Sequence, residues 1–408
     1  MAGGGRRAAR MSDTLQCPGG IQIPRLNICP ELFLDRCIAF YGPSGTGKSV
    51  FVKDLMYELR GHVPQVIVVS PTEPSNRTYE GIVPPPLLHY SIGLGPLPAK
   101  ETPAAIKARG VAFFNEIIKR QTALVDVYGR VNKLEHLQRL FGKIAPGHRA
   151  RAETQIRALG LMRDRWLGEM EALHGRGSDR CQQVVTKAAD KYKETLAAIY
   201  KRAIADNHAA LWRQCGRQRA HPEAAAAEGG EHLTLEQEIL TYIDLNPRLL
   251  LVLDDCAAGL KPFLNLECFR TLFYQGRHLR ITSMFCLQDD VDLGPSLRKN
   301  VFFSFYMGAG VANSNFMRKA NFTQEHTRVA LEAVKVVFRV PYRKLVYWRE
   351  DPTGRHFYYA IASEHPRFPF CTASLLELCR EVGRGDEVDQ SNAYTRRLMT
   401  QPCGAAPP

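Results

Sequence analysis

Two kinds of hydrophobic pattern alternate along this 408-residue chain: short runs that are almost wholly apolar, and longer stretches in which apolar residues recur every three or four positions. The runs CIAFY (37–41) and QVIVVS (65–70) have the length and composition of strands buried on both faces, as in parallel sheets. Between them lies an amphipathic helical pattern, with apolar positions at Phe51, Leu55, Met56 and Leu59. The N-terminal part therefore predicts a strand, a helix and a second strand.

From about residue 102 to 219 the strand pattern disappears, and the apolar positions follow helical spacing only. Breaks are expected near Pro146 and at 175–177. We interpret this region as an inserted bundle or hairpin of several helices, followed by a flexible tether at 221–232. The apolar positions are Phe113, Ile117, Leu124, Val131, Leu134, Leu137 and Phe141, and further on Val184, Leu196, Ile199 and Tyr200.

The mixed pattern returns with the run RLLLVLDD (248–255). A helix is expected around 266–274, and strands at 281–288 and 301–308. Three later runs also look like strands, and DPTG between the last two predicts a hairpin turn: KVVFRV (335–340), RKLVYWRE (343–350) and RHFYYAIA (355–362). The chain is thus predicted to be an α/β protein with a mainly parallel central sheet, a large α-helical insertion and a C-terminal β-hairpin.

These patterns divide the chain into five segments. We expect a disordered basic N-terminal tail over 1–19, the first part of the core over 20–100 and its second part over 236–365. The helical insertion and tether occupy 101–235, and a C-terminal tail occupies 366–408.

Composition narrows the class of protein. Hydrophobic residues make up 45% of the chain and charged residues 23%, which is typical of a globular protein. No membrane span is expected, and the N-terminus lacks the apolar stretch of a secretory signal. The eleven cysteines are scattered, never in C-x-x-C spacing, which predicts free thiols in a reducing intracellular compartment and neither zinc nor disulfides.

Positive charge is concentrated in the insertion. The chain has a net charge of +13, and between Lys100 and Gly230 there are 24 basic and 14 acidic residues, an excess of 10. Such charge favours a polyanionic partner such as nucleic acid, although Lys- and Arg-rich helical surfaces are also common without one.

The run GPSGTGKS fits the phosphate-binding P-loop pattern G-x-x-x-x-G-K-[ST] and lies between a predicted strand and a predicted helix. Its glycines let successive backbone N–H groups face phosphate oxygens. Lys48 would bridge the outer phosphates, and Ser49 would offer a hydroxyl ligand to Mg²⁺. The predicted triphosphate-binding residues are Gly42, Pro43, Ser44, Gly45, Thr46, Gly47, Lys48 and Ser49.

Later strands end in polar residues that suit the same site. Asp254 is the candidate Mg²⁺ ligand and Asp255 the candidate general base, because both follow an apolar strand. Gln288 closes the next strand, where it could sense the γ-phosphate. We expect Arg277, with His278 and Arg280, to lie near the same edge and to contact phosphates or DNA, or to act across a subunit boundary.

Taken in order, these motifs resemble the DNA-packaging ATPases of large DNA viruses, a branch of the FtsK–HerA superfamily. The resemblance covers roughly 20–95 and 240–345. Two features depart from the family pattern: the insertion is longer than expected, and Asp255 stands where many members carry glutamate. The matching residues are Ser70, Pro71, Thr72, Asn76, Tyr79, Asp254, Asp255, Gly276, Arg277, His278, Gln288, Arg298 and Asn300.

The resemblance implies a RecA-like P-loop core in which the sensor strand lies between the P-loop strand and the Walker B strand. It further implies an ATPase with ATP and Mg²⁺ as cofactors, and a homo-oligomeric ring in which an arginine of one subunit completes the site of the next. Arg298 is the first candidate for that arginine, with Arg277 or Arg318 behind it. The implied partners are double-stranded DNA and capsid or portal-vertex proteins, at the virus assembly site of the host cell or in the virion.

Three alternatives stay open. A translocase or helicase of the same superfamily could act in replication, and a nucleotide-gated scaffold could bind ATP and DNA with little hydrolysis. GPSGTGKS also resembles the P-loop of guanylate kinase, but such kinases need a compact acceptor domain soon after it, where this chain has helices.

Overall fold

The computed structural model describes residues 14–93, 102–131, 133–142, 144, 146–175, 178–207, 243–318 and 322–382. The predicted tether at 221–232 and most of the loop at 92–100 lie outside these residues. The chain forms two compact units. The first comprises Met1–Ile118, Arg248–Phe370 and Val382–Thr395, and the second comprises Lys119–Pro247, Cys371–Glu381 and Arg396–Pro408.

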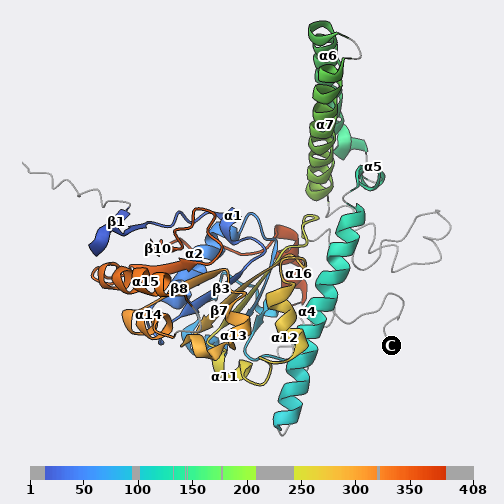
Figure 1. Ribbon diagram of the computed structural model, residues 1–408. Helices are drawn as coiled ribbons and strands as arrows, with labels where there is room; N and C mark the ends of the chain where they lie inside the picture. Colours follow the sequence, from blue (N-terminus) through green and yellow to red (C-terminus); the bar gives the residue numbers. More distant parts are fainter. Residues whose placement is uncertain are drawn as a thin grey trace, which may run out of the picture. The chain divides into compact units, whose positions relative to one another are not determined.

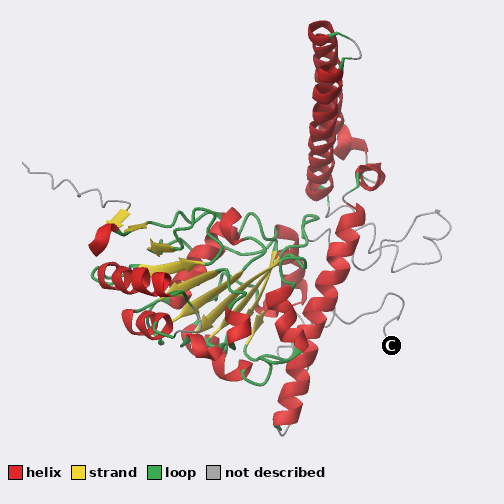
Figure 2. Cartoon of the chain, in the orientation of Figure 1, coloured by secondary structure: helices red, strands yellow, loops and turns green. Residues whose placement is uncertain are grey.

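An eight-stranded sheet forms the centre of the first unit (Figures 1 and 2), with the strand order β10-β9-β8-β3-β7-β6-β4-β5. The strands from β8 to β5 in this order run parallel, while β9 and β10 form an antiparallel hairpin at one side. This arrangement confirms the predicted parallel sheet and terminal hairpin. The strands are β3 (Cys37–Tyr41), β4 (Gln65–Val69), β5 (Leu88–His89), β6 (Leu249–Asp254), β7 (Ile281–Leu287), β8 (Phe303–Tyr306), β9 (Lys344–Trp348) and β10 (Phe357–Ala360).

The four strands that neighbour one another at the centre are buried at every residue. Their apolar runs reflect this position, because both faces of the sheet are shielded from water. Helix α2 (Lys48–Leu59) follows β3 and buries the stripe formed by Phe51, Leu55, Met56 and Leu59, as the pattern predicted. The remaining helices of this unit are α1 (Pro30–Phe33), α3 (Glu73–Asn76), α11 (Ala257–Leu260), α12 (Glu267–Tyr274), α13 (Pro295–Arg298), α14 (Ala309–Phe316) and α15 (Gln324–Val337), with 3₁₀ turns η1 (Pro18–Gly20), η2 (Pro85–Leu87) and η3 (Asp290–Asp292).

The prediction of a strand at 335–340 was wrong. Helix α15 runs from Gln324 to Val337, and the hydroxyl of its N-cap residue Thr323 accepts the N–H of His326. Its buried residues are Ala330, Ala333, Val334 and Val337. These positions have the spacing of one helical face, so 335–337 form the last turn of an amphipathic helix, and 338–340 are the turn that follows it.

Both predicted tails contain regular structure. Strand β1 (Thr14–Gln16) pairs antiparallel with β2 (Gln22–Pro24), although 1–19 was expected to be disordered. Helix α16 (Ala373–Val382) lies within the expected C-terminal tail, where Leu375, Leu378 and Cys379 are buried.

The described part of the second unit is helical, as predicted for the insertion. Helix α4 (Pro103–Val131) begins in the first unit and ends in the second, which also contains α5 (Leu134–Gly142), α6 (Pro146–His174) and α7 (Asp179–Asp206). Helices α6 and α7 pack along each other. Helix α5 also contacts α7, where the rings of Phe141 in α5 and Tyr200 in α7 lie 5.0 Å apart. Helix α6 begins at Pro146 and ends before Gly175, where breaks were expected. In the described part of the chain, no helix has both the length and the apolarity needed to cross a membrane.

Truncation of a central strand tests how far the first unit depends on this sheet. Leu251 in β6 is fully buried, so Leu251→Ala should lower the free energy of unfolding by about 2–5 kcal/mol. Tyr342 is 80% exposed, and Tyr342→Ala should change the free energy of unfolding by about 0.5 kcal/mol or less. Urea unfolding measures both, and similar values for the two variants would contradict the central position of β6.

Candidate nucleotide site

The predicted P-loop connects β3 to α2 at the carboxyl edge of the parallel sheet. Gly47 caps α2 in the left-handed conformation, with φ of 93°, which glycine adopts without strain. Gly42 has no room for a side chain, because a Cβ atom there would lie 2.6 Å from Cβ of Met307. The loop therefore needs glycine for two separate reasons, one conformational and one steric.

Lys48 is buried at the start of α2 and folds back over the loop. Its Nζ donates to the carbonyl oxygens of Gly42 and Pro43 at 2.7 and 3.0 Å. The same nitrogen lies 3.8 Å from Oδ1 of Asp255. The lysine charge is thus held between the loop and the end of β6, where it suits the outer phosphates of a nucleotide.

Asp254 is the centre of a hydrogen-bonded group at the end of β6. Its Oδ2 accepts hydrogen bonds from Oγ of Ser49 at 3.0 Å and from the hydroxyl of Tyr79 at 2.8 Å. Its Oδ1 is buried and has no hydrogen-bond partner in the described part of the chain, and the residue is only 2% exposed. A buried carboxylate oxygen without a partner, beside a serine hydroxyl, fits the oxygen ligands that Mg²⁺ prefers.

Tyr79 was matched to the family pattern, but its contact with Asp254 was not predicted. Burial, followed by the charge of Asp254, raises the pKa of Tyr79 well above its ordinary value, so the phenol stays protonated and donates. The carboxylate of Glu73 accepts the N–H groups of Thr78 and Tyr79 at 3.0 and 2.8 Å and fixes this loop. A contact between residues 175 positions apart leaves no local pattern in the sequence.

Asp255 follows β6 in the left-handed region, with φ of 52°. This conformation is uncommon for aspartate and occurs at sites where a side chain must take a particular direction. Its Oδ2 accepts a long hydrogen bond, 3.5 Å, from Oγ1 of Thr72, which in turn lies 3.4 Å from Oγ of Ser70. Asp255 therefore lies beside both Lys48 and the loop after β4, as a general base at the γ-phosphate would require.

Gln288 lies at the same edge. The carbonyl of Leu287 accepts the N–H of Gly42 at 3.0 Å, so Gln288, the next residue, lies next to the start of the P-loop. Its side chain is exposed, while its N–H donates to Oδ2 of Asp292 at 3.1 Å. The position agrees with a sensor, and that role stays a prediction.

Arg298 and Arg318 both pair with Asp290, two residues after Gln288. Asp290 is fully buried, and burial raises the pKa of its carboxyl group. Arg318 also reaches Asp289 at 3.2 Å. A hydrogen bond with the Asp290 carboxyl, followed in size by the hydrogen bond from Arg318, lowers the pKa of Asp289 to about 2. Both arginines are thus tied to carboxylates of their own chain.

The prediction that Arg277, His278 and Arg280 lie near the nucleotide edge was wrong. Strands β7 and β3 are parallel, with Cys37 opposite Ser283 and Tyr41 opposite Leu287. The turn at 276–280 precedes β7 and therefore lies at the opposite edge, about 20 Å from Gln288 along the strand. Arg277 cannot contact a nucleotide held by the P-loop of its own chain.

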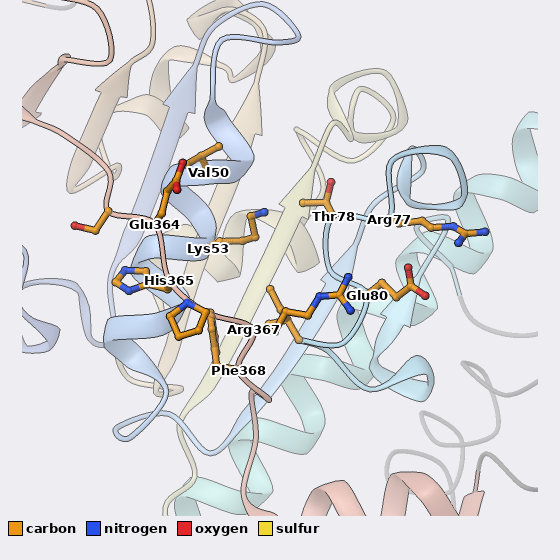
Figure 3. Close-up of a pocket in the computed structure, with 12 residues that line it drawn as sticks. Val50, Lys53, Arg77, Thr78, Glu80, Glu364, His365, Arg367 and Phe368 are labelled. Carbon is orange, nitrogen blue, oxygen red and sulfur yellow. The ribbon is translucent and has the colours of Figure 1, made fainter.

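A cavity of about 350 Å³ lies beside α2, as Figure 3 shows. The start of α2, the loop after α3 and the segment 363–368 line it, and its charged side chains have both signs. That segment is fastened to α2, because His365 Nε2 lies 2.5 Å from Asp54 and the ring stacks on Tyr57 at 3.7 Å. The lining residues with charge are Lys53, Arg77, Arg367, Glu80 and Glu364.

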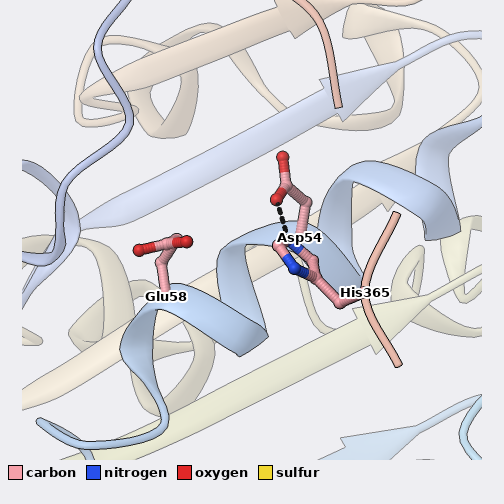
Figure 4. A group of neighbouring side chains, drawn as sticks. All are labelled: Asp54, Glu58 and His365. Carbon is pink, nitrogen blue, oxygen red and sulfur yellow. Dashed lines mark hydrogen bonds and ion pairs between the residues drawn. The ribbon is translucent and has the colours of Figure 1, made fainter. Parts of the chain in front are cut away.

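Asp54, Glu58 and His365 could in principle hold a metal ion, since their ligand atoms lie within 4.8 Å of one another (Figure 4). Both oxygens of Asp54 already have partners, however, namely His365 and the N–H of Ser363 at 3.1 Å. We interpret the group as a structural link between α2 and the segment after β10.

No protein-family model matches the chain. The chain is 35% identical over 381 residues to protein B354L of African swine fever virus (isolate Kenya 1950), which covers 93% of this chain and 97% of that protein. Among solved structures it is similar to the genome packaging NTPase B204 of Sulfolobus turreted icosahedral virus 2, at 10% identity and a TM-score of 0.30 over 82% of this chain and 99% of that one. The plasmid coupling protein TrwB gives 14% identity and a TM-score of 0.33 over 89% and 92% of the two chains. Both TM-scores are low, and the strand order defines the fold without them.

Removal of the Tyr79 hydroxyl tests the metal site. Tyr79→Phe deletes a hydrogen bond to a buried carboxylate, worth about 1.5–3 kcal/mol, so Mg²⁺-dependent binding of ATP should weaken about 10- to 100-fold. Tyr358→Phe is the matched control, because it removes a 2.6 Å hydrogen bond to Asp351 in the distant hairpin. Binding of a fluorescent ATP analogue at increasing Mg²⁺ concentration measures both, and an unchanged midpoint for Tyr79→Phe would argue against this organisation of Asp254.

Proposed function

The chain belongs to the family of African swine fever virus protein B354L, and from its nucleotide site we propose that it is an ATP-hydrolysing motor that packages double-stranded viral DNA into capsids. The observation that carries the proposal is the meeting of Lys48, Ser49, Asp254 and Asp255 at one sheet edge. The sensor strand β7 lies between the P-loop strand and the Walker B strand, as the resemblance to packaging ATPases implied.

Hydrolysis follows from the positions of these side chains. The P-loop amides and Lys48 would bind the triphosphate, and Ser49 and Asp254 would hold Mg²⁺, which neutralises charge on the phosphate oxygens. Asp255 lies 3.8 Å from the lysine nitrogen and would accept the proton of the attacking water. Gln288, at the tip of β7, would orient that water.

The subunits of such a motor would form a ring, and we infer that Arg277 is the arginine that crosses the subunit boundary. Arg277 is exposed, and among the described residues no carboxylate pairs with it. Arg298 and Arg318, in contrast, are held by Asp289 and Asp290. The edge that carries Arg277 faces away from its own nucleotide, which suits a group that acts on the nucleotide of a neighbour.

Charge supports DNA as the track of the motor. The excess of 10 positive charges between Lys100 and Gly230 would favour contacts with phosphates that depend little on sequence and strongly on salt. Capsid or portal-vertex proteins would be further partners, at the virus assembly site of the host cell.

The first test is the rate of ATP hydrolysis with and without long double-stranded DNA. We expect DNA to stimulate the rate and a nucleoside monophosphate to have no effect, since a kinase would respond in the opposite way. Lys48→Ala should abolish turnover, because the outer phosphates lose their cation, while Lys335→Ala on the exposed face of α15 should not change it. An ATPase rate that does not change when DNA is added would contradict a DNA motor.

The inter-subunit arginine has its own test. Arg277→Ala and Lys48→Ala should each be inactive, with a loss of about 10³-fold or more for Arg277→Ala. Mixing the two should restore activity, because a Lys48→Ala subunit supplies Arg277 to the intact P-loop of its neighbour. Arg298→Ala mixed with Lys48→Ala is the comparison, and restoration only in that second mixture would assign the role to Arg298.

A further inference from the structure

We propose that Asp35 is the positioning residue for Arg277, so that this buried carboxylate controls the arginine that one subunit presents to the next. The inference rests on the proposed function, in which Arg277 acts across the subunit boundary. Asp35 lies just before β3 and is 7% exposed.

Asp35 joins the starts of three neighbouring strands. Its carboxylate accepts two hydrogen bonds from Arg248, before β6, at 3.1 and 3.3 Å, and one from Arg280, before β7, at 2.9 Å. Its own N–H donates to Oγ1 of Thr282 in β7 at 2.8 Å. One carboxylate thus links the N-terminal ends of β3, β6 and β7, at the edge of the sheet that carries Arg277.

The turn that carries Arg277 is itself constrained. A Cβ atom at Gly276 would lie 2.3 Å from the carbonyl oxygen of Leu272, so only glycine fits there. The N–H of Ile281 donates to the carbonyl of Gly276 at 2.8 Å, and the N–H of Arg280 donates to the carbonyl of Arg277 at 3.2 Å. Arg280 has a left-handed backbone, with φ of 57°, which is uncommon for arginine. The ion pair between Arg280 and Asp35 holds the turn in this conformation.

Charge at this edge explains why the turn needs such an anchor. The guanidinium of Arg36 lies over the ring of Phe302 at 3.8 Å, and its buried Nη1 has no hydrogen-bond partner among the residues that the structure describes. Burial, followed by the positive charge of Arg277, lowers the pKa of Arg36. Like charges would drive the turn away from the sheet. The charges of Glu350 and, after it, Asp35 act on Arg36 in the opposite direction, and Asp35 also pairs with Arg280 of the turn itself.

Mixed assemblies test the inference. The donor subunit carries Lys48→Ala, which leaves Arg277 intact, and the acceptor carries Arg277→Ala, which leaves the nucleotide site intact. Adding Asp35→Asn to the donor should lower the restored ATPase rate about 10- to 100-fold, since displacing a catalytic group such as Arg277 by about 1 Å has an effect of this size on the rate. Adding Asp35→Asn to the acceptor should leave the rate unchanged, because the Arg277 turn of the acceptor is not used.

This asymmetry separates positioning from a general loss of structure, which would lower the rate in both arrangements and overturn the inference. Arg280→Gln, at a side chain that is 45% exposed, is a second donor variant for the case that Asp35→Asn does not fold. Arg355→Gln, in the exposed hairpin turn, is its control. Full restoration by the altered donors would overturn the role of Asp35 alone, whereas no restoration by the unaltered donor would overturn the inter-subunit arginine and this inference with it.

Discussion

Parallel pairing of β3, β7 and β6 is the constraint on which the nucleotide site depends. Because the three strands run in one direction, the P-loop, Gln288 and the two aspartates at the end of β6 reach the same edge. The register is tight: Tyr41 is opposite Leu287, and Asp254 is opposite Cys286. A slip of one residue would turn every side chain of β6 to the other face of the sheet and remove Asp254 from Ser49.

The buried carboxylate of Asp254 costs free energy that other groups at this edge must offset. Burying a carboxylate costs several kcal/mol unless hydrogen bonds or a cation compensate for the lost water. Ser49 and Tyr79 compensate at one oxygen, and the second oxygen has no hydrogen-bond partner among the described residues. A cation beside Asp254 would therefore stabilise this edge, and binding of the proposed Mg²⁺ would be coupled to its folding.

The sequence predicted the parts of the site that lie next to each other along the chain. The P-loop, the aspartates after β6 and the hairpin all have local patterns of residue type and spacing. It failed where one local pattern allows two structures, as at 335–340, where a short apolar run belongs to α15. It also placed Arg277 at the wrong edge of the sheet. Arg277 and Gln288 are close in sequence, but the whole length of β7 lies between them. Contacts such as Asp35 with Arg280 depend on strand order, which no local pattern contains.

The two edges of the sheet carry opposite halves of the proposed motor. In this proposal the carboxyl edge would hold the groups that bind and hydrolyse ATP, and the amino edge holds Arg277 on a turn linked to the same strands. If the closely packed sheet moves as a rigid body when the nucleotide changes, its two edges move together. In a ring, a change of nucleotide in one subunit would therefore move the arginine that it offers to the next. Sequential action of the subunits would then follow from the geometry of a single sheet, with no separate signalling element.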